Sequence, residues 1–400
     1  MTACRRSVLI LGAFGAFGRL ITNALAQTTD LPIVAAGRRL PEAQEFRPGI
    51  RQLAIDSRSL SAAVLKELDP AVLIDTVGPF QTRDRKLAGL CIDLGIHYVD
   101  LADGREFVQN VAALNAAAVQ RNVLVVSGAS TVPALSSAVV QHLAAEFSQV
   151  EEIDVGIAPA YSGPRGLATA RSVLGYVGRA VPIWREARMD VARGWSDTKR
   201  HRYPPPVGRR NLSLIDVPDM SLIPPRYPAL RQLAVRAGHE VPLVHHMLRL
   251  LGVLVSIGLI RDLASHAQIL LRMAAWFDRF GSNNGAMHVR LRGRGNDGAL
   301  RSRTWTLVAE QGDGPRIPTL AAILLTKKLL NVPGYAPIAS RGAMPAMNLL
   351  TLREFEREWA ALAVRTAVTS EACADASSPY QRGPRGILRQ SPRATSHRAT

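Results

Sequence analysis

Short apolar runs alternate with helix-like stretches over the first third of the chain. The runs are rich in β-branched residues, which is typical of buried strands in a parallel sheet. They are Val8–Leu11, Ile33–Ala36, Arg51–Ile55, Val72–Thr76, His97–Asp100 and Val123–Val126. The stretches between them predict helices at Phe17–Gln27, Ser59–Leu68, Arg85–Leu94 and Phe107–Arg121. Strand and helix alternate with short turns, and this predicts an α/β fold with a doubly wound parallel sheet.

The pattern changes after Ser127, where strand-like runs, helices and long Pro- and Arg-rich loops are mixed. The predicted strands are Ile153–Ile157, Met287–Leu291 and Thr304–Val308. The predicted helices are Pro133–Phe147, Leu243–Ile260, Asp262–Phe280, Pro318–Leu330 and Leu352–Ala367. We therefore expect a first domain over 1–147, a second, α+β domain over 148–315, C-terminal helices that return to the first domain over 316–368, and a disordered tail over 369–400.

Composition narrows the class of protein. The 400 residues are 47% hydrophobic, which suits a globular chain of two domains, and the net charge is +17. Arg and Lys are spread along the chain without interleaved aromatic residues, so a basic pocket for a small anion is favoured over nucleic-acid binding. Cys4, Cys91 and Cys373 offer neither a disulfide framework nor metal-ligand spacing, and a cytoplasmic location and no metal site are expected.

The most hydrophobic stretch is Leu248–Ile260, and Arg249 and Arg261 lie at its two ends. It is shorter than the roughly 20 residues that a membrane-spanning helix needs. A buried helix and a peripheral contact with a lipid surface both remain open for this stretch. A homodimer is open as well, because no residue pattern identifies an interface.

A glycine-rich turn follows the first strand directly. Gly12, Gly15 and Gly18 occur at three-residue spacing, before a predicted helix. Glycines in such a turn allow a tight bend, a close approach of the backbone to a pyrophosphate and close helix–strand packing. The helix N-terminus directs N–H groups at the phosphates. The turn therefore predicts a Rossmann-type nucleotide site, to which Phe14 and Phe17 of the same loop also belong.

The end of the second strand indicates which dinucleotide is bound. NAD-binding domains usually carry an acidic residue there, whereas this chain has Gly37-Arg38-Arg39. Two guanidinium groups can pair with a 2′-phosphate, so NADP(H) is predicted. Further cofactor contacts are expected at the ends of the next two strands, from Asp56, which can alternatively cap the following helix, and from Gly78, Pro79 and Phe80.

These motifs together resemble a known family. Gly12-x-x-Gly15-x-x-Gly18, Ala36-Gly37-Arg38, Val77-Gly78-Pro79-Phe80 and Gly95-Ile-His97-Tyr98-Val99-Asp100-Leu101 occur in that order. They are similar to the NADP-binding domain of the saccharopine dehydrogenase-like, or saccharopine reductase-like, family. Ser127-Gly-Ala-Ser130-Thr-Val-Pro133 resembles the family's loop before the inter-domain helix, and later segments resemble an uncharacterised bacterial branch, so the likeness covers about residues 7–365.

The resemblance implies a Rossmann domain, a second α/β domain, NADP(H), and formation or oxidation of a C–N bond or, in one branch, enoyl reduction in lipid pathways. Many relatives carry Glu after the Tyr-Val-Asp strand, where this chain has Ala102-Asp103-Gly104. No motif for saccharopine itself is found, so lysine metabolism is not supported.

Candidate catalytic residues come from the end of the fifth strand. Asp103 is the first choice for a polar group that handles a proton, with Tyr98 and His97 as further candidates. Candidate substrate contacts are Arg165 and Thr169, in a loop that leads into a helix, and His288, on a strand that could face the cleft between the domains.

The sequence thus predicts an NADP(H)-dependent oxidoreductase that transfers hydride to or from a C=N, C=O or conjugated C=C bond of a small molecule. A non-catalytic NADP(H)-binding sensor or accessory protein is the first alternative, because no proton donor is certain from the pattern. A lipid-associated enoyl reductase is the second.

Overall fold

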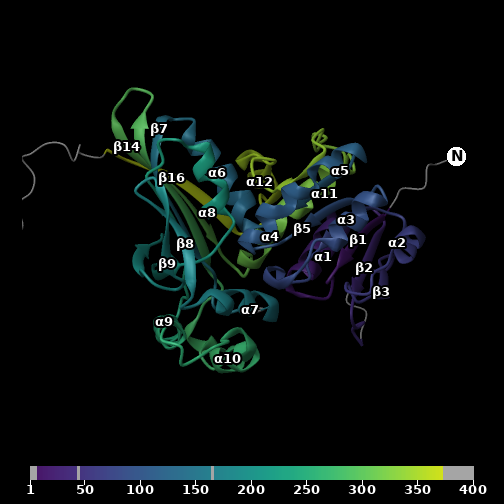
Figure 1. The fold of residues 1–400 in the computed structure, drawn as a ribbon, viewed down its shortest axis with the longest axis horizontal. Coiled ribbons are helices and arrows are strands. Elements are labelled where there is room, and N and C mark those ends of the chain that lie inside the picture. Colours follow the sequence, from purple (N-terminus) through teal and green to yellow (C-terminus); the bar gives the residue numbers. More distant parts are fainter. Residues whose placement is uncertain (1–6, 43–45, 164–165, 373–400) are drawn as a thin grey trace, which may run out of the picture.

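The computed structural model describes residues 7–42, 46–163 and 166–372 (Figure 1). Its first sheet has seven strands in the order β15-β6-β5-β4-β1-β2-β3, and all of its neighbouring strands are parallel. The strands are β1 (Ser7–Leu11), β2 (Ile33–Gly37), β3 (Arg51–Ala54), β4 (Pro70–Asp75), β5 (His97–Asp100), β6 (Leu124–Ser127) and β15 (Gly342–Pro345). The predicted doubly wound sheet is confirmed, and β15 is a seventh strand that the sequence did not indicate.

Helices pack on both faces of this sheet, because apolar side chains alternate between the two faces of each strand. Val8 and Ile10 contribute to one buried cluster, whereas Leu9 and Leu11 contribute to another. The helices of this region are α1 (Ala16–Thr28), α2 (Ala62–Leu68), α3 (Lys86–Asp93), α4 (Arg105–Gln109), α5 (Asn115–Gln120) and the later α11 (Leu320–Leu329). The sequence predicted a single helix over Phe107–Arg121. This prediction is wrong, because a 3-10 segment separates α4 from α5.

The second sheet is a mixed sheet in the order β10-β11-β12-β7-β13-β14-β16, and the β8–β9 hairpin joins it at β12. Its strands are β7 (Phe147–Ala158), β8 (Ala180–Arg185), β9 (Arg188–Arg193), β10 (Lys199–Arg202), β11 (Arg209–Leu214), β12 (Gln232–Ala237), β13 (Gly285–Gly295), β14 (Leu300–Ala309) and β16 (Val364–Ala372). The sequence located parts of β7, β13 and β14. Several of the other strands, such as β9 and β10, are rich in polar residues, so the hydropathy pattern does not reveal them.

Helices cover one face of the second sheet, on the side of the first sheet (Figure 1). They include α6 (Ser136–Ala144), α8 (Asp219–Leu222) and α12 (Leu352–Glu358). Below them in the view, α7 (Leu167–Tyr176) extends toward the first sheet, with α9 (Pro242–Ser256) and α10 (Ala267–Ala275) beneath it. The helices α6, α8 and α12 therefore lie between the two sheets, and α9 packs on β11 of the second sheet.

Two expectations about the C-terminal part need correction. The helix predicted over Leu352–Ala367 ends with α12 at Glu358, and the chain then enters β16, which pairs with β14. The pairing extends to Ala372, so the expected tail cannot begin at Thr369. The rest of that expected tail, 373–400, lies outside the described residues.

The apolar stretch Leu248–Ile260 belongs largely to α9, which has 15 residues. Among the described residues, no helix combines the length and the apolar character needed to cross a membrane.

Candidate functional site

The glycine turn lies between β1 and α1. Gly12 has a φ of +76°, and a Cβ added to Gly18 would lie 2.2 Å from the Gly12 carbonyl oxygen. Both positions therefore require glycine, the first for its backbone conformation and the second for its contact. Within the described part of the chain, no side chain caps the first turn of α1, so its N–H groups can donate hydrogen bonds to an anionic ligand.

The end of β2 lies beside this turn. Phe14 packs on Gly37, where an added Cβ would come within 2.6 Å of the ring, and Phe14 stacks on Phe46 with ring centroids 5.7 Å apart. Arg38 and Arg39 follow Gly37 and are both exposed. The two guanidinium groups are therefore available to a ligand that extends over the glycine turn from β1 toward β2.

Asp56 lies at the end of the neighbouring β3 and forms a local turn. Its Oδ1 accepts a hydrogen bond from the Arg58 backbone N–H at 3.0 Å. The next helix, α2, is capped by Ser61 instead. The structure therefore gives Asp56 a turn-forming contact and does not make it the helix cap that the sequence left open.

The segment after β4 brings Gly78, Pro79 and Phe80 to the carboxyl edge of the first sheet. A Cβ added to Gly78 would lie 3.3 Å from the Ala168 Cβ in the first turn of α7. Phe80 is buried and packs on Phe107, with ring centroids 5.4 Å apart. This edge is thus in contact with a helix from the second half of the chain.

The beginning of α7 also approaches the glycine turn. A Cβ added to Gly166, which precedes α7, would be 4.0 Å from the Ala16 Cβ at the start of α1. Thr169, a predicted substrate contact, is exposed in the first turn of α7. Arg165, the other predicted contact in this loop, lies outside the described residues. The N-termini of α1 and α7 and the Gly78 edge therefore surround one region at the sheet's carboxyl edge.

Asp103 links this region to α7 through polar contacts. Its Oδ1 accepts a hydrogen bond from Gln81 Nε2 at 3.1 Å, and its Oδ2 accepts one from the Ser172 hydroxyl of α7. Burial raises the pKa of Asp103, while the hydrogen bonds from Ser172 and Gln81 act in the opposite direction. Arg105 pairs with Asp216 at 2.8 Å and makes a second polar link between the two halves of the chain.

Gln81 and Ser172 were not among the residues singled out from the sequence. Gln81 directly follows the Val77–Phe80 motif, so its position was a usable signal. Ser172 lies one turn beyond the Arg165–Thr169 segment, but helical periodicity alone does not show which side of α7 meets the first sheet. Only the contact between the two halves identifies Ser172.

Tyr98 and His97 do not join Asp103. Tyr98 is buried in the core and its hydroxyl donates to Asp75 Oδ2 at 3.2 Å. His97 is the first residue of β5, and its Nδ1 accepts a hydrogen bond from the Leu124 N–H at 2.9 Å. Because a strand advances about 3.3 Å per residue, His97 lies at the opposite end of β5 from the carboxyl edge. The expected cluster at the strand end is thus reduced to Asp103.

His288 also lies elsewhere than expected. Ile153 and Val155 of β7 face the helix-covered core, so Asp154 between them faces the open side of the second sheet. His288 of β13 lies on that open side, where its Nδ1 contacts the Tyr203 hydroxyl at 2.9 Å and its ring stacks on His201. The structure therefore does not direct His288 toward the region around Asp103.

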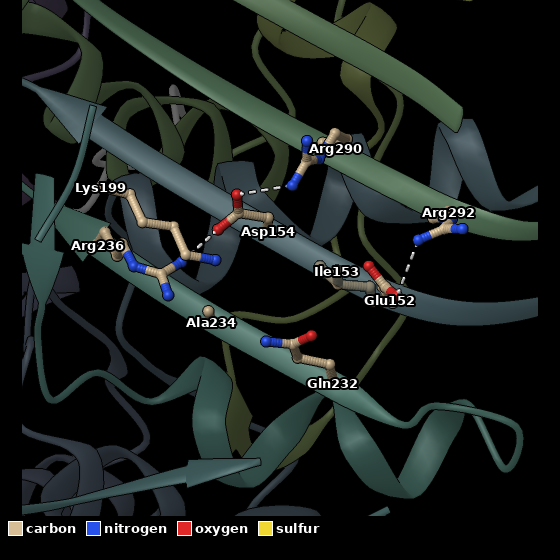
Figure 2. A pocket seen from close by; sticks show the side chains of 9 residues that line it. All are labelled: Glu152, Ile153, Asp154, Lys199, Gln232, Ala234, Arg236, Arg290 and Arg292. Atoms are coloured by element: carbon tan, nitrogen blue, oxygen red, sulfur yellow. Dashed lines mark hydrogen bonds and ion pairs between the residues drawn. The ribbon is translucent and has the colours of Figure 1, made fainter. Parts of the chain in front are cut away.

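A polar pocket on this open side contains several arginines (Figure 2). Arg236 donates to Asp154 at 2.8 Å and to Asp197 at 2.7 Å, and Arg290 donates to Asp154 at 3.3 Å. Burial would raise the pKa of Asp154, but His288, whose Nε2 lies 3.9 Å from Oδ2, and the Arg236 charge lower it to about 2. These charges compensate one another, so the pocket is an ion-pair network of the sheet face.

Among the described residues, no group of three or more His, Cys, Asp or Glu side chains is arranged to hold a metal ion. The candidate site consists of the glycine turn, Arg38 and Arg39, the Gly78 edge, and the Asp103–Gln81–Ser172 cluster.

Comparisons with known proteins point to the same region. Residues 8–126 match the family described as "Saccharopine dehydrogenase NADP binding domain". Saccharopine dehydrogenase (L-Glu forming) from Saccharomyces cerevisiae has a TM-score of 0.63 at 14% identity, covering 91% of this chain and 100% of its own. Homospermidine synthase from Legionella pneumophila, in complex with NAD, has a TM-score of 0.59 at 10% identity, covering 96% and 95%. No curated protein matches the chain.

At these identities the solved structures show a shared fold, and they confirm the predicted arrangement of a Rossmann-type sheet with a second sheet domain. The family match confirms the predicted cofactor class for the first domain, and it covers β1 to within β6.

Proposed function

Because residues 8–126 match the family described as "Saccharopine dehydrogenase NADP binding domain", we propose that the chain is an NADP(H)-dependent oxidoreductase. It transfers hydride to or from a C=N, C=O or conjugated C=C bond of a small molecule. The observation that carries the proposal is the junction between the dinucleotide site and α7, where Asp103 of the first domain meets Ser172 of the second half. A reacting group held there is adjacent to both the cofactor region and the half-buried carboxyl group of Asp103.

The glycine turn fits a dinucleotide. A Cβ at Gly18 would collide with the backbone of Gly12, and the first turn of α1 has N–H groups that no side chain caps. Close packing of the helix on a glycine turn and an uncapped helix N-terminus are both features of a pyrophosphate site in this fold. When bound, the nicotinamide would supply the hydride, and the protein supplies position and proton handling.

Arg38 and Arg39 support the preference for NADP(H). Both are exposed at the carboxyl end of β2, where the ribose of a dinucleotide on the glycine turn lies in this fold. A 2′-phosphate placed there accepts charge-assisted hydrogen bonds from guanidinium groups. No carboxylate follows β2 directly to repel that phosphate.

Asp103 is the proposed proton donor in the reducing direction. Burial raises its pKa, so its protonated form persists to higher pH than that of an exposed aspartate. Ser172 and Gln81 hold the carboxyl group between the first sheet and α7. Thr169 in the first turn of α7 and Arg165 before it are the proposed substrate contacts.

Calorimetric titration with NADPH and NADH tests the cofactor assignment. We expect the Arg38→Ala/Arg39→Ala variant to lose about 1.5–3 kcal/mol of NADPH binding, which is tenfold or more in affinity, with little change for NADH. Arg188→Ala/Arg353→Ala removes two other exposed arginines and serves as the matched control. Equal loss in both variants would mean that only the general positive charge matters, and an unchanged NADPH affinity in the test variant would reject the assignment.

A further inference from the structure

Exposed apolar side chains are concentrated on α9, α10 and the turn that follows each helix. Of the large hydrophobic side chains that are exposed in the described residues, most lie between residues 243 and 280. They are Leu243, Met247, Leu250, Val253, Ile257, Leu259, Ile269, Met273, Trp276 and Phe280, and we call this set the α9–α10 surface. Soluble monomers rarely expose apolar side chains in so concentrated a group, so the surface requires an explanation.

The residues of the surface follow helical spacing. Leu243, Met247 and Leu250 occupy one side of α9, and Ile257 directly follows the helix, whereas His245, Leu248 and Gly252 on the other side are buried. In and after α10, Ile269, Met273, Trp276 and Phe280 recur at intervals of four, three and four residues. Each segment therefore presents an apolar stripe that none of the described residues covers.

Cationic side chains accompany the stripes. Residues 242–280 contain Arg249, Arg261, Arg272 and Arg279 but only two acidic residues, Asp262 and Asp278. Asp262 is engaged in a local turn, where its Oδ1 accepts from the Ala264 N–H at 3.1 Å. By helical period Arg272 flanks the stripe of α10 instead of lying opposite to it. Aliphatic and aromatic residues flanked by arginines are the composition of a helix that lies in an anionic lipid interface.

We propose that the α9–α10 surface docks the protein on an anionic lipid membrane, with the two helices lying in the interface. Trp276 is 75% exposed, which suits the position that an indole ring prefers at the boundary between headgroups and acyl chains. A second copy of the chain fits this surface less well, because a two-fold contact would bring identical cationic flanks together. The proposal does not rest on the proposed oxidoreductase function.

The location of the surface would give docking a consequence for the candidate site. The helix α10 packs on α7, and the first turn of α7 approaches the glycine turn and the Gly78 edge (Figure 1). A docked protein would therefore hold α7, and with it one side of the cofactor region, close to the membrane.

The test is co-sedimentation of the full chain with vesicles of phosphatidylcholine, with and without phosphatidylglycerol. We expect binding to the anionic vesicles, and a loss of at least about tenfold in affinity for Leu250→Ser/Ile257→Ser/Trp276→Ser. Met189→Ser/Val191→Ser changes exposed apolar residues of β9 and is the matched control, which should bind as the unaltered protein does. We expect Arg272→Gln/Arg279→Gln to remove most of the preference for phosphatidylglycerol.

Tryptophan emission gives a second readout that does not depend on sedimentation. Trp195, Trp305 and Trp359 are buried and Trp184 is half-buried, so a blue shift on adding vesicles reports mainly on Trp276 and should vanish in Trp276→Phe. Absence of binding to anionic vesicles would overturn the proposal. Sedimentation equilibrium would do so too if it showed a dimer that the triple variant dissociates, because a second copy would then occupy the surface. Equal weakening by the β9 control would also reject it.

Discussion

The residues around Asp103 set the pKa of its carboxyl group. Burial raises its pKa, and the hydrogen bond from the Ser172 hydroxyl is the largest opposing effect. A proton donor must be protonated, so the rate of the reducing reaction should fall as pH rises through this pKa. The pH at which the rate falls is therefore set in part by a residue of α7.

We expect Ser172→Ala to move this fall in kcat to higher pH, because the lost hydrogen bond stabilised the carboxylate form. Asp103→Asn should lower kcat by about 100-fold or more, since a carboxamide cannot donate the proton, and should leave the dissociation constant for NADPH nearly unchanged. Steady-state rates across pH, once a substrate is found, measure both effects.

Two further variants make this prediction specific. Ser172→Thr retains a hydroxyl donor and should restore the original pH profile, and Asp93→Asn alters an exposed aspartate and should leave kcat unchanged. If Ser172→Ala lowered the rate equally at every pH, Ser172 would have only a structural role. If Asp103→Asn kept full activity, another group would supply the proton.

Single site residues could be predicted from the sequence where the local backbone admits only one residue type. Gly12 and Gly18 could be recognised because the turn admits no side chain there. His97 begins the strand that the sequence predicts, so its position at the amino end could have been recognised, but the partners of Tyr98 and His97 could not. Their hydrogen bonds to Asp75 and from Leu124 depend on strands distant in sequence.

At the scale of elements, the approach of α1 to β1 depends on Gly18. A Cβ there would lie 2.2 Å from the Gly12 oxygen and 2.8 Å from the Ala13 Cα, and both are backbone atoms that cannot rotate away. We expect Gly18→Ala to destabilise the protein by about 3 kcal/mol, which urea unfolding would measure. The displaced helix should also lose NADPH affinity.

Gly89 in α3 is the matched control for this substitution. It also lies in a helix of the first domain, but no atom lies within 4 Å of a Cβ added there. Gly89→Ala should therefore stabilise the protein by about 0.5–1 kcal/mol, because alanine is favoured in a helix interior. A similar loss of stability in both variants would show that helix packing on the glycine turn is not the cause.

The strands of the first sheet could be predicted because they are buried on both faces and form continuous apolar runs. Strands such as β10 (Lys199–Arg202) and β16 are rich in polar residues, and their strand character comes from pairing with a partner. The error at Leu352–Ala367 has the same origin. No Gly or Pro separates the end of α12 from β16, and β14, the partner of β16, lies more than fifty residues earlier.

At the scale of the whole molecule, the C-terminal part connects the two sheets. After β14 the chain enters the buried helix α11, which packs on α1 and on β4 and β5, and then adds β15 to the first sheet. It returns through α12 to place β16 on the second sheet. Composition and periodicity could not predict this double return, because it depends on which sheet edges remain open after the earlier strands have paired.

One buried cluster also extends through both halves. It includes Val8 and Ile10 of β1, Leu324 of α11, and Val155 and Val289 of the second sheet. When two sheets share a core, neither can lose its packing without exposing apolar surface of the other. The two-sheet body should therefore unfold as one unit, although it is built from two sheets.

We expect urea-dependent hydrogen exchange to show this unit directly. Amides of β1 in the first sheet and of β14 in the second should reach the same opening free energy and the same dependence on urea, since both exchange only through global unfolding. The partly exposed α10 should open at lower free energy and so provides an internal reference. If β14 exchanged at lower urea than β1, the second sheet would be a separate folding unit, and the shared cluster would contribute little to the coupling of the two sheets.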